Sequence, residues 1–175
     1  MAPSLILIGF MGSGKTAVGK RVARELGWKF IDTDAVVEQK KGKSISEIFA
    51  AEGETGFRRA EAAAVLSLLE EAATACGGEV ISLGGGAVTI PEVLKRLRDE
   101  PLVVFLDQDV EEAFARSQDG RRPLALNRER FGELYAEREN FYRTASGYAV
   151  DVRGRTVAEI AREIAGIIRE RKTGL

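Results

Sequence analysis

The chain has 175 residues, 45% of them apolar and 30% charged, and its 26 basic and 27 acidic residues leave a net charge of −1. This balance is typical of one globular domain and offers no general attraction to nucleic acid or to an anionic membrane. The absence of histidine excludes histidine general bases, histidine triads and histidine-ligated zinc.

The one cysteine, Cys76, cannot form a disulfide within the chain. The sequence also shows no basic leader segment and no apolar run of membrane-spanning length. We therefore expect a cytoplasmic protein.

Apolar runs separated by turn residues predict strands and helices that alternate along the chain. Strands are expected at 4–9, 29–32, the first part of 79–88, 101–107 and 147–152. Helices are expected at 15–26, 35–41, 46–51, 58–76, 91–97, 110–116, 130–144 and 157–169, with Ser44 or Ser46 capping the third. The alternation predicts the α/β class with a parallel sheet, in one domain spanning 1–175.

The letters GFMGSGKT at 9–16 fit the P-loop pattern, between a predicted strand and a predicted helix. Glycines let backbone N–H groups turn toward phosphate oxygens, and the helix start adds partial positive charge. Lys15 can reach the β- and γ-phosphates of ATP, and the Thr16 hydroxyl can bind Mg²⁺. A glycine-rich turn without a ligand is the alternative, which this context disfavours. The predicted ATP-binding residues here are Gly12, Ser13, Gly14, Lys15, Thr16 and Ala17.

Two aspartates follow the second predicted strand, at the sheet edge where ligands of α/β proteins bind. Asp32 can hold Mg²⁺ through water, and Asp34 can accept hydrogen bonds from substrate hydroxyls. The alternative is that Asp34 only caps the next helix. Beside a P-loop we favour the site.

Two arginines lie on predicted helices. Arg58 can bind a carboxylate or a phosphate with its forked guanidinium, and Glu61, one turn later, can orient it. Arg138 shares a helix face with Tyr135 and Tyr142. The alternatives are an ordinary surface ion pair for Arg58 and a solvated, charged face for Arg138.

Two loops complete the set. Gly84, Gly85 and Gly86 follow a strand, where they permit close approach of backbone to a ligand, although a plain loop is possible. The loop at 117–126 carries Arg122 before Pro123. A lid with an arginine suits phosphoryl transfer, because its closure excludes water and adds positive charge.

Six motifs, in this order, resemble those of the shikimate kinase family over nearly the whole chain. A P-loop alone occurs in many families, but the six together are specific; only Ala125 departs, where a leucine is common. They stand at Gly9–Thr16, Asp32–Asp34, Gly53–Glu61, Leu83–Gly86, Arg122–Leu124 and Tyr135–Ala145.

The resemblance implies the fold of nucleoside monophosphate kinases, with a five-stranded parallel sheet, a substrate-binding region at about 33–61 and a lid at about 117–127. It implies transfer of the γ-phosphoryl group of ATP to the 3-hydroxyl of shikimate, a step of aromatic amino acid biosynthesis, with one Mg²⁺ ion. The expected partners are ATP and shikimate, bound by a monomer that binds neither nucleic acid nor membrane.

The resemblance also assigns roles to residues. Asp34 would bind ring hydroxyls, and Arg58 and Arg138 the carboxylate. Lys15, Asp34 and Arg122 are the expected catalytic residues, with Arg122 rather than Arg121 in the lid. The other expected contacts are Gly84, Gly85, Gly86, Phe49, Phe57 and Glu61 for shikimate, and Arg116 and Arg153 for adenine.

Two rival functions are weighed. A kinase for gluconate or a nucleoside monophosphate would use the same P-loop, but the ordered motifs disfavour it. A non-enzymatic P-loop switch lacks support, because no Asn-Lys-x-Asp stretch is present and Asp151-x-x-Gly154 comes too late in the chain.

Overall fold

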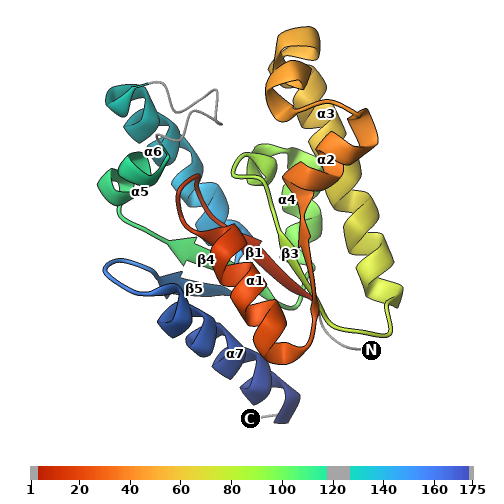
Figure 1. The fold of residues 1–175 in the computed structure, drawn as a ribbon, viewed down its shortest axis with the longest axis vertical. Coiled ribbons are helices and arrows are strands. Elements are labelled where there is room, and N and C mark those ends of the chain that lie inside the picture. Colours follow the sequence, from red (N-terminus) through yellow and green to blue (C-terminus); the bar gives the residue numbers. More distant parts are fainter. Residues whose placement is uncertain (1–3, 118–126, 174–175) are drawn as a thin grey trace.

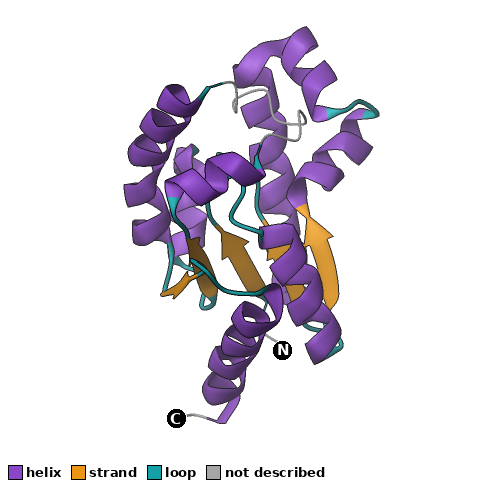
Figure 2. Ribbon diagram, turned by 60° about the vertical axis from the view of Figure 1, so that its left-hand side comes forward, coloured by secondary structure: helices purple, strands orange, loops and turns teal. Residues whose placement is uncertain are grey.

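A computed structural model of the chain describes residues 4–117 and 127–173. These residues form a three-layer α/β fold in which helices cover both faces of one sheet (Figures 1 and 2). The sheet has five strands in the order β2-β3-β1-β4-β5, and every neighbouring pair is parallel. The strands are β1 (Leu5–Ile8), β2 (Lys29–Asp32), β3 (Glu79–Ser82), β4 (Val103–Asp107) and β5 (Tyr148–Asp151).

The helices agree with the predicted ones in number and place, apart from α2, α3 and one short 3₁₀ helix, η1, that was not predicted. They are α1 (Lys15–Leu26), α2 (Thr33–Lys41), α3 (Ile45–Thr74), η1 (Ala87–Thr89), α4 (Pro91–Arg98), α5 (Val110–Arg116), α6 (Arg128–Ala145) and α7 (Val157–Thr173). Among these helices of the described ranges, none combines the length and the apolar character that crossing a bilayer requires.

The central strand β1 contributes side chains to the hydrophobic layers on both faces of the sheet. Its four residues are almost fully buried, as expected for a strand that is covered on both faces. Leu5 and Leu7 pack with α1 and α7, while Ile6 and Ile8 pack with α3, α4 and α6. Because side chains alternate along a strand, β1 joins both layers and fixes the loop that follows it at the carboxyl edge of the sheet.

Helix α3 contains both helices that were predicted at 46–51 and 58–76, separated by a break between them. It runs from Ile45 to Thr74 with a single break at Gly53, whose φ of 67° and ψ of −177° fall in a region open only to glycine. Ser44, not Ser46, caps its start: the Ser44 hydroxyl accepts a hydrogen bond from the Glu47 amide at 3.3 Å, and the Glu47 carboxylate accepts one from the Ser44 amide at 2.7 Å.

Candidate active site

A cavity of about 770 Å³ opens at the carboxyl ends of the strands, between the loop after β1, the first halves of α2 and α3, and α6. It gathers most of the residues that the sequence singles out. The predicted residues that line it are Gly12, Gly14, Lys15, Thr16, Ala17, Asp32, Asp34, Phe49, Phe57, Arg58, Glu61, Gly84, Gly85, Gly86, Arg116 and Arg138.

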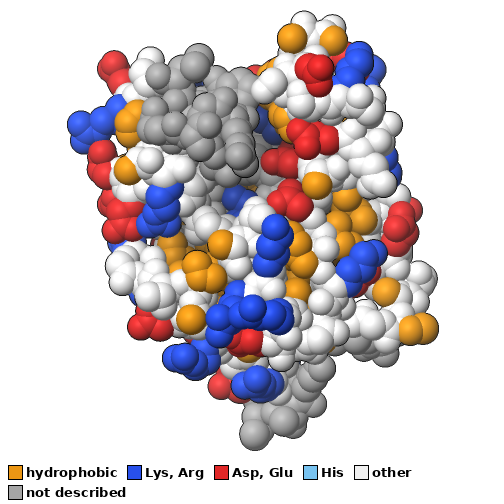
Figure 3. Space-filling view, in the orientation of Figure 1, with side chains coloured by type: hydrophobic (Ala, Val, Ile, Leu, Met, Phe, Trp, Pro, Cys, Tyr) orange, Lys and Arg blue, Asp and Glu red, His pale blue; other side chains and the backbone are white. Residues whose placement is uncertain are grey.

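A second, shallower depression of about 370 Å³ lies beside α1, where basic side chains gather on the surface in Figure 3. Lys20, Arg21 and Arg24 line it together with Ala17 and Val157. No carboxylate is among these residues, so the depression lacks a group that could accept a proton from a substrate hydroxyl.

The loop from Gly9 to Gly14 has the backbone conformation that its glycines permit. Gly12 and Gly14 have φ values of 81° and 84°, in the left-handed region. At Gly12 a side chain is also excluded sterically, because a Cβ atom would lie 2.4 Å from the Ala113 carbonyl oxygen on α5. Gly14 is the N-cap of α1, so the loop ends at the positive end of the helix dipole.

The Lys15 ammonium group lies inside this loop. It donates hydrogen bonds to the carbonyl oxygens of Gly9 at 2.7 Å and Phe10 at 3.0 Å. Ser13, which was also predicted to bind ATP, is buried, and its amide donates to the Phe10 carbonyl at 3.3 Å. Ser13 is not among the residues that line the cavity.

Asp32 joins the loop to α2. Its carboxylate accepts a hydrogen bond from the Thr16 hydroxyl at 2.9 Å and one from the Asp34 amide at 3.1 Å. Asp32 is therefore the N-cap of α2, and the alternative that Asp34 caps this helix is wrong. Asp34 instead lies in the first helical turn and lines the cavity.

The half-buried Arg58 and the buried Glu61 form an ion pair on α3. The Arg58 Nη1 and Glu61 Oε2 atoms are 2.5 Å apart, and the Glu61 side chain is 1% exposed. Arg58 also contacts the exposed Glu54, with 3.2 Å between Nη2 and Oε1. Burial raises the pKa of Glu61, and the charge of Asp34 adds to this, whereas the Arg58 guanidinium lowers it. The alternative of an ordinary surface pair is therefore wrong for Glu61.

Arg138 is buried as well, being 5% exposed, so the alternative of a solvated helix face is wrong. Its guanidinium carbon lies 5.8 Å from the centre of the Phe10 ring. Burial lowers the pKa of Arg138, and the charge of Arg58 contributes to the shift. The guanidinium groups of the half-buried Arg58 and the buried Arg138 line one cavity and are suited to binding an anion there.

The glycines at 84–86 fit closely around these side chains. A Cβ atom at Gly84 would lie 2.2 Å from Glu61 Oε1 and 2.7 Å from Asp34 Oδ1, and one at Gly86 would lie 2.2 Å from Arg58 Nη1. The Gly85 carbonyl accepts a hydrogen bond from the buried Tyr142 hydroxyl at 2.5 Å. The prediction invoked close approach to a ligand, but the protein's own charged groups already require glycine here.

Phe49 and Phe57 lie on the two sides of the break at Gly53. Their ring centres are 4.7 Å apart, and both residues line the cavity. The change of chain direction at Gly53 thus separates two helical pieces that each present one ring to the site.

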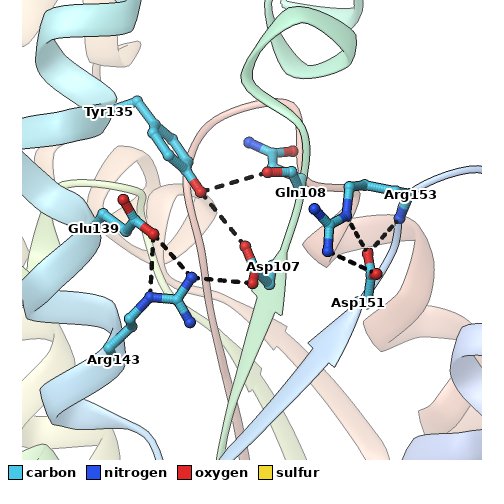
Figure 4. Close-up of polar contacts among 7 residues, drawn as sticks. All are labelled: Asp107, Gln108, Tyr135, Glu139, Arg143, Asp151 and Arg153. Atoms are coloured by element: carbon cyan, nitrogen blue, oxygen red, sulfur yellow. Dashed lines mark hydrogen bonds and ion pairs between the residues drawn. The ribbon is translucent and has the colours of Figure 1, made fainter.

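Three predicted arginines outside the acceptor end of the cavity differ in position. Arg116, on α5, lines the cavity and donates to the Gly12 carbonyl at 3.3 Å. Arg153 lies beyond β5 and binds Asp151, with 2.8 Å between Nε and Oδ1, outside the lining of the cavity (Figure 4). Arg122, with nearly all of the expected lid at 117–127, lies outside the described residues.

Several functional positions were missed from the sequence. Met11, Glu38, Ser44, Ile45 and Ser46 also line the cavity. Met11 carried a signal, because it lies inside the P-loop pattern. Ser44, Ile45 and Ser46 have ordinary helix-start character and Glu38 is an ordinary residue within α2, so only the position of α2 and α3 brings these four to the site.

Comparison with known proteins gives consistent results. The family model "Shikimate kinase" matches residues 11–169. A shikimate kinase of Moorella thermoacetica is 45% identical over 94% of this chain and 93% of its own length. The structure of a shikimate kinase from Acinetobacter baumannii in complex with shikimate superposes with a TM-score of 0.90 and 32% identity over 98% of this chain and 96% of that one. That of Aquifex aeolicus gives a TM-score of 0.82 and 31% identity, over 98% and 99% of the two chains.

Proposed function

The chain belongs to the shikimate kinase family and is an ATP-dependent kinase, and from that premise we propose how its cavity transfers the γ-phosphoryl group of ATP to the 3-hydroxyl of shikimate. One observation carries the proposal. A phosphate-binding loop, the half-buried Arg58, the buried Arg138 and Asp34 all line the same cavity. A triphosphate and a hydroxylated carboxylic acid can therefore be held side by side.

At the nucleotide end, we assign the triphosphate to the backbone of Gly12–Ala17, with Ser13 as the least accessible member, and to the Lys15 ammonium group. Lys15 leaves the carbonyl oxygens of Gly9 and Phe10 for the phosphates, where its charge has a stronger partner. Arg116 extends toward the adenine. From the sequence alone, Arg153 is assigned to the adenine and Arg122 to the γ-phosphoryl group.

The Thr16 hydroxyl and the Asp32 carboxylate are suited to Mg²⁺. Both supply oxygen atoms and are joined by a hydrogen bond of 2.9 Å. Thr16 lies in the first turn of α1 and Asp32 at the end of β2, and both line the cavity beside the proposed triphosphate. Magnesium favours sites with few protein ligands, in which phosphates and water supply the rest. We assign Thr16 as a direct ligand and Asp32 as a ligand through water; the ion supplies charge neutralisation.

At the acceptor end, we assign the carboxylate of shikimate to Arg58 and Arg138. Glu61 fixes the direction of the Arg58 guanidinium through the 2.5 Å contact. The ring would lie between Phe49 and Phe57 on one side and the backbone of Gly84–Gly86 on the other, with its hydroxyls toward Asp34.

In the reaction, the 3-hydroxyl oxygen attacks the γ-phosphorus, the bond to the β–γ bridging oxygen breaks, and ADP leaves. Asp34 holds the hydroxyl in line and accepts its proton. Lys15 and Arg122 stabilise the charge that develops on the transferred group and on the leaving oxygen.

We further propose a single domain over 1–175, with the substrate-binding region at about 33–61 and a lid at about 117–127, that acts as a cytoplasmic monomer. The net charge of −1 and the placement of both ligand ends in one cavity support small-molecule ligands rather than nucleic acid or a membrane.

The test is release of ADP from Mg-ATP with shikimate, gluconate or AMP as acceptor. We expect strong dependence on shikimate alone, and an equal rate with another acceptor would refute the assignment of Asp34, Arg58 and Arg138. Lys15→Ala should lower kcat by at least about a hundredfold, the loss typical for a group that stabilises transition-state charge. An unchanged kcat would remove Lys15 from the mechanism. Slow hydrolysis of ATP without any acceptor dependence would favour a switch protein.

A further inference from the structure

Gln108 is a polar residue that the proposed mechanism does not use, although it lies directly beneath the phosphate-binding loop. It follows the last residue of β4 and is 4% exposed. Its Nε2 atom donates a hydrogen bond to the carbonyl oxygen of Met11 at 3.1 Å, a contact between residues 97 positions apart. Figure 4 shows its neighbourhood at the end of β4, with the Tyr135 hydroxyl reaching Asp107 and the Gln108 backbone carbonyl.

The Oε1 atom of Gln108 shows which way the side-chain amide is oriented. This atom is buried and accepts no hydrogen bond from the residues that the structure describes. A buried acceptor without a donor is costly, and nearly all buried polar atoms avoid that state. Turning the amide over would place Oε1 against the Met11 carbonyl oxygen, so the donor must face Met11.

The Met11 carbonyl fixes the direction of the next amide. In a trans peptide the C=O and the N–H point in opposite directions within one plane. Holding the Met11 oxygen toward Gln108, outside the loop, therefore directs the Gly12 N–H to the opposite side, into the loop. Gly12 lines the cavity, and its conformation, with a φ of 81°, leaves the peptide plane to be set by such contacts.

We propose that Gln108 is a positioning residue for nucleotide binding: its side-chain amide locks the Met11–Gly12 peptide so that the Gly12 N–H faces the phosphates of ATP. The segment after β4 supports the same loop at a second place. There the Ala113 carbonyl leaves no room for a side chain at Gly12, and Arg116 donates to the Gly12 carbonyl at 3.3 Å. The inference rests on the proposed role of residues 9–16 in binding phosphate.

The first test compares Gln108→Met with the unaltered chain and with Gln39→Met, a matched change at an exposed residue of α2. Titration calorimetry should show the Kd for Mg-ADP rising about five- to tenfold in Gln108→Met, the effect of one lost hydrogen bond, and unchanged in Gln39→Met. The Kd for shikimate should stay the same in both, and the KM for ATP should rise more than kcat falls. A purely structural role would lower the melting temperature without changing the Kd for Mg-ADP, and that result would overturn the proposal.

The second variant, Gln108→Glu, has a different signature and serves if Gln108→Met does not fold. A carboxylate here cannot donate to the Met11 carbonyl, whereas a protonated carboxyl can, and burial raises the pKa of a carboxyl. At each pH, the Kd of the variant for Mg-ADP is divided by the Kd of the unaltered chain. This ratio should fall toward one as the pH falls from about 8 to about 5.5. A ratio independent of pH would overturn the proposal. Failure of the unaltered chain to bind Mg-ADP would instead refute the proposed function.

Discussion

Two glutamates bind the same arginine from very different surroundings, and this gives a matched experiment. Glu61 Oε2 lies 2.5 Å from Arg58 Nη1 with its side chain 1% exposed, whereas Glu54 Oε1 lies 3.2 Å from Nη2 with its side chain 55% exposed. We compare Glu61→Gln with Glu54→Gln. Both changes keep the shape of the side chain and remove one negative charge from the same guanidinium.

The expected magnitudes follow from burial. A charge-assisted hydrogen bond away from water contributes about 1.5–3 kcal/mol, and glutamine retains one weaker neutral acceptor. Glu61→Gln should therefore weaken shikimate binding by about 1.5–2 kcal/mol, or about ten- to thirtyfold in Kd. An exposed pair contributes less than about 1 kcal/mol, so Glu54→Gln should change the Kd by less than about fivefold.

The assay is calorimetric titration of each variant with shikimate and, separately, with Mg-ADP. The Kd for Mg-ADP should be unchanged in both variants, because the two carboxylates that bind Arg58 belong to its own helix, α3, whereas the phosphate-binding loop follows β1. Equal effects of the two substitutions on shikimate binding would refute the reasoning, since burial would then not govern how firmly Arg58 is held.

Two further predictions concern other parts of the fold. Gly84→Ala should raise the KM for shikimate and destabilise the fold by about 1–3 kcal/mol, because its Cβ atom would displace the buried Glu61 carboxylate. Gly166→Ala, where a Cβ atom would have no neighbour within 4 Å, should stabilise α7 by up to about 1 kcal/mol. Urea denaturation measures both free energies of unfolding, and changes of the same sign would contradict the steric argument. Hydrogen bonds from Arg153 hold the pKa of Asp151 at about 2, below its ordinary value of 3.8. Because the folded-state pKa is the lower one, this stabilisation is present above the ordinary value and is lost as the pH falls through about 2. Carboxyl carbon NMR should show the Asp151 pKa returning toward 3.8 in Arg153→Gln, and an unmoved titration would remove Arg153 as its cause.

Local pattern was enough for most of the fold. The run that becomes β1 has no polar position and the run that becomes β4 has one only at its end, Asp107, so both strands require cover on both faces. The P-loop pattern has a fixed place between strand and helix. The choice between Asp32 and Asp34 as cap needed the structure. Asp32 still pairs with Ser82 of β3, so the strand ends there and the helix begins at the next residue.

Burial of charge was the harder problem. The spacing of Arg138 with Tyr135 and Tyr142 is equally typical of a solvated helix face, and only the packing of α6 against Phe10 decides between them. The contact of Gln108 with Met11 depends on tertiary structure in the same way, because no local signal distinguishes Gln108 from an ordinary polar residue after a strand.

The glycines at 84–86 have a consequence for inhibitor design. A side chain at Gly84 or Gly86 would collide with Glu61 or Arg58, so this wall of the cavity consists of main chain. A point substitution at either glycine would therefore disturb the charged pair behind the wall. A compound anchored on this wall would leave little scope for resistance by single mutations. Selectivity between related kinases must come from positions that line the cavity with a side chain, such as Met11 and Ile45.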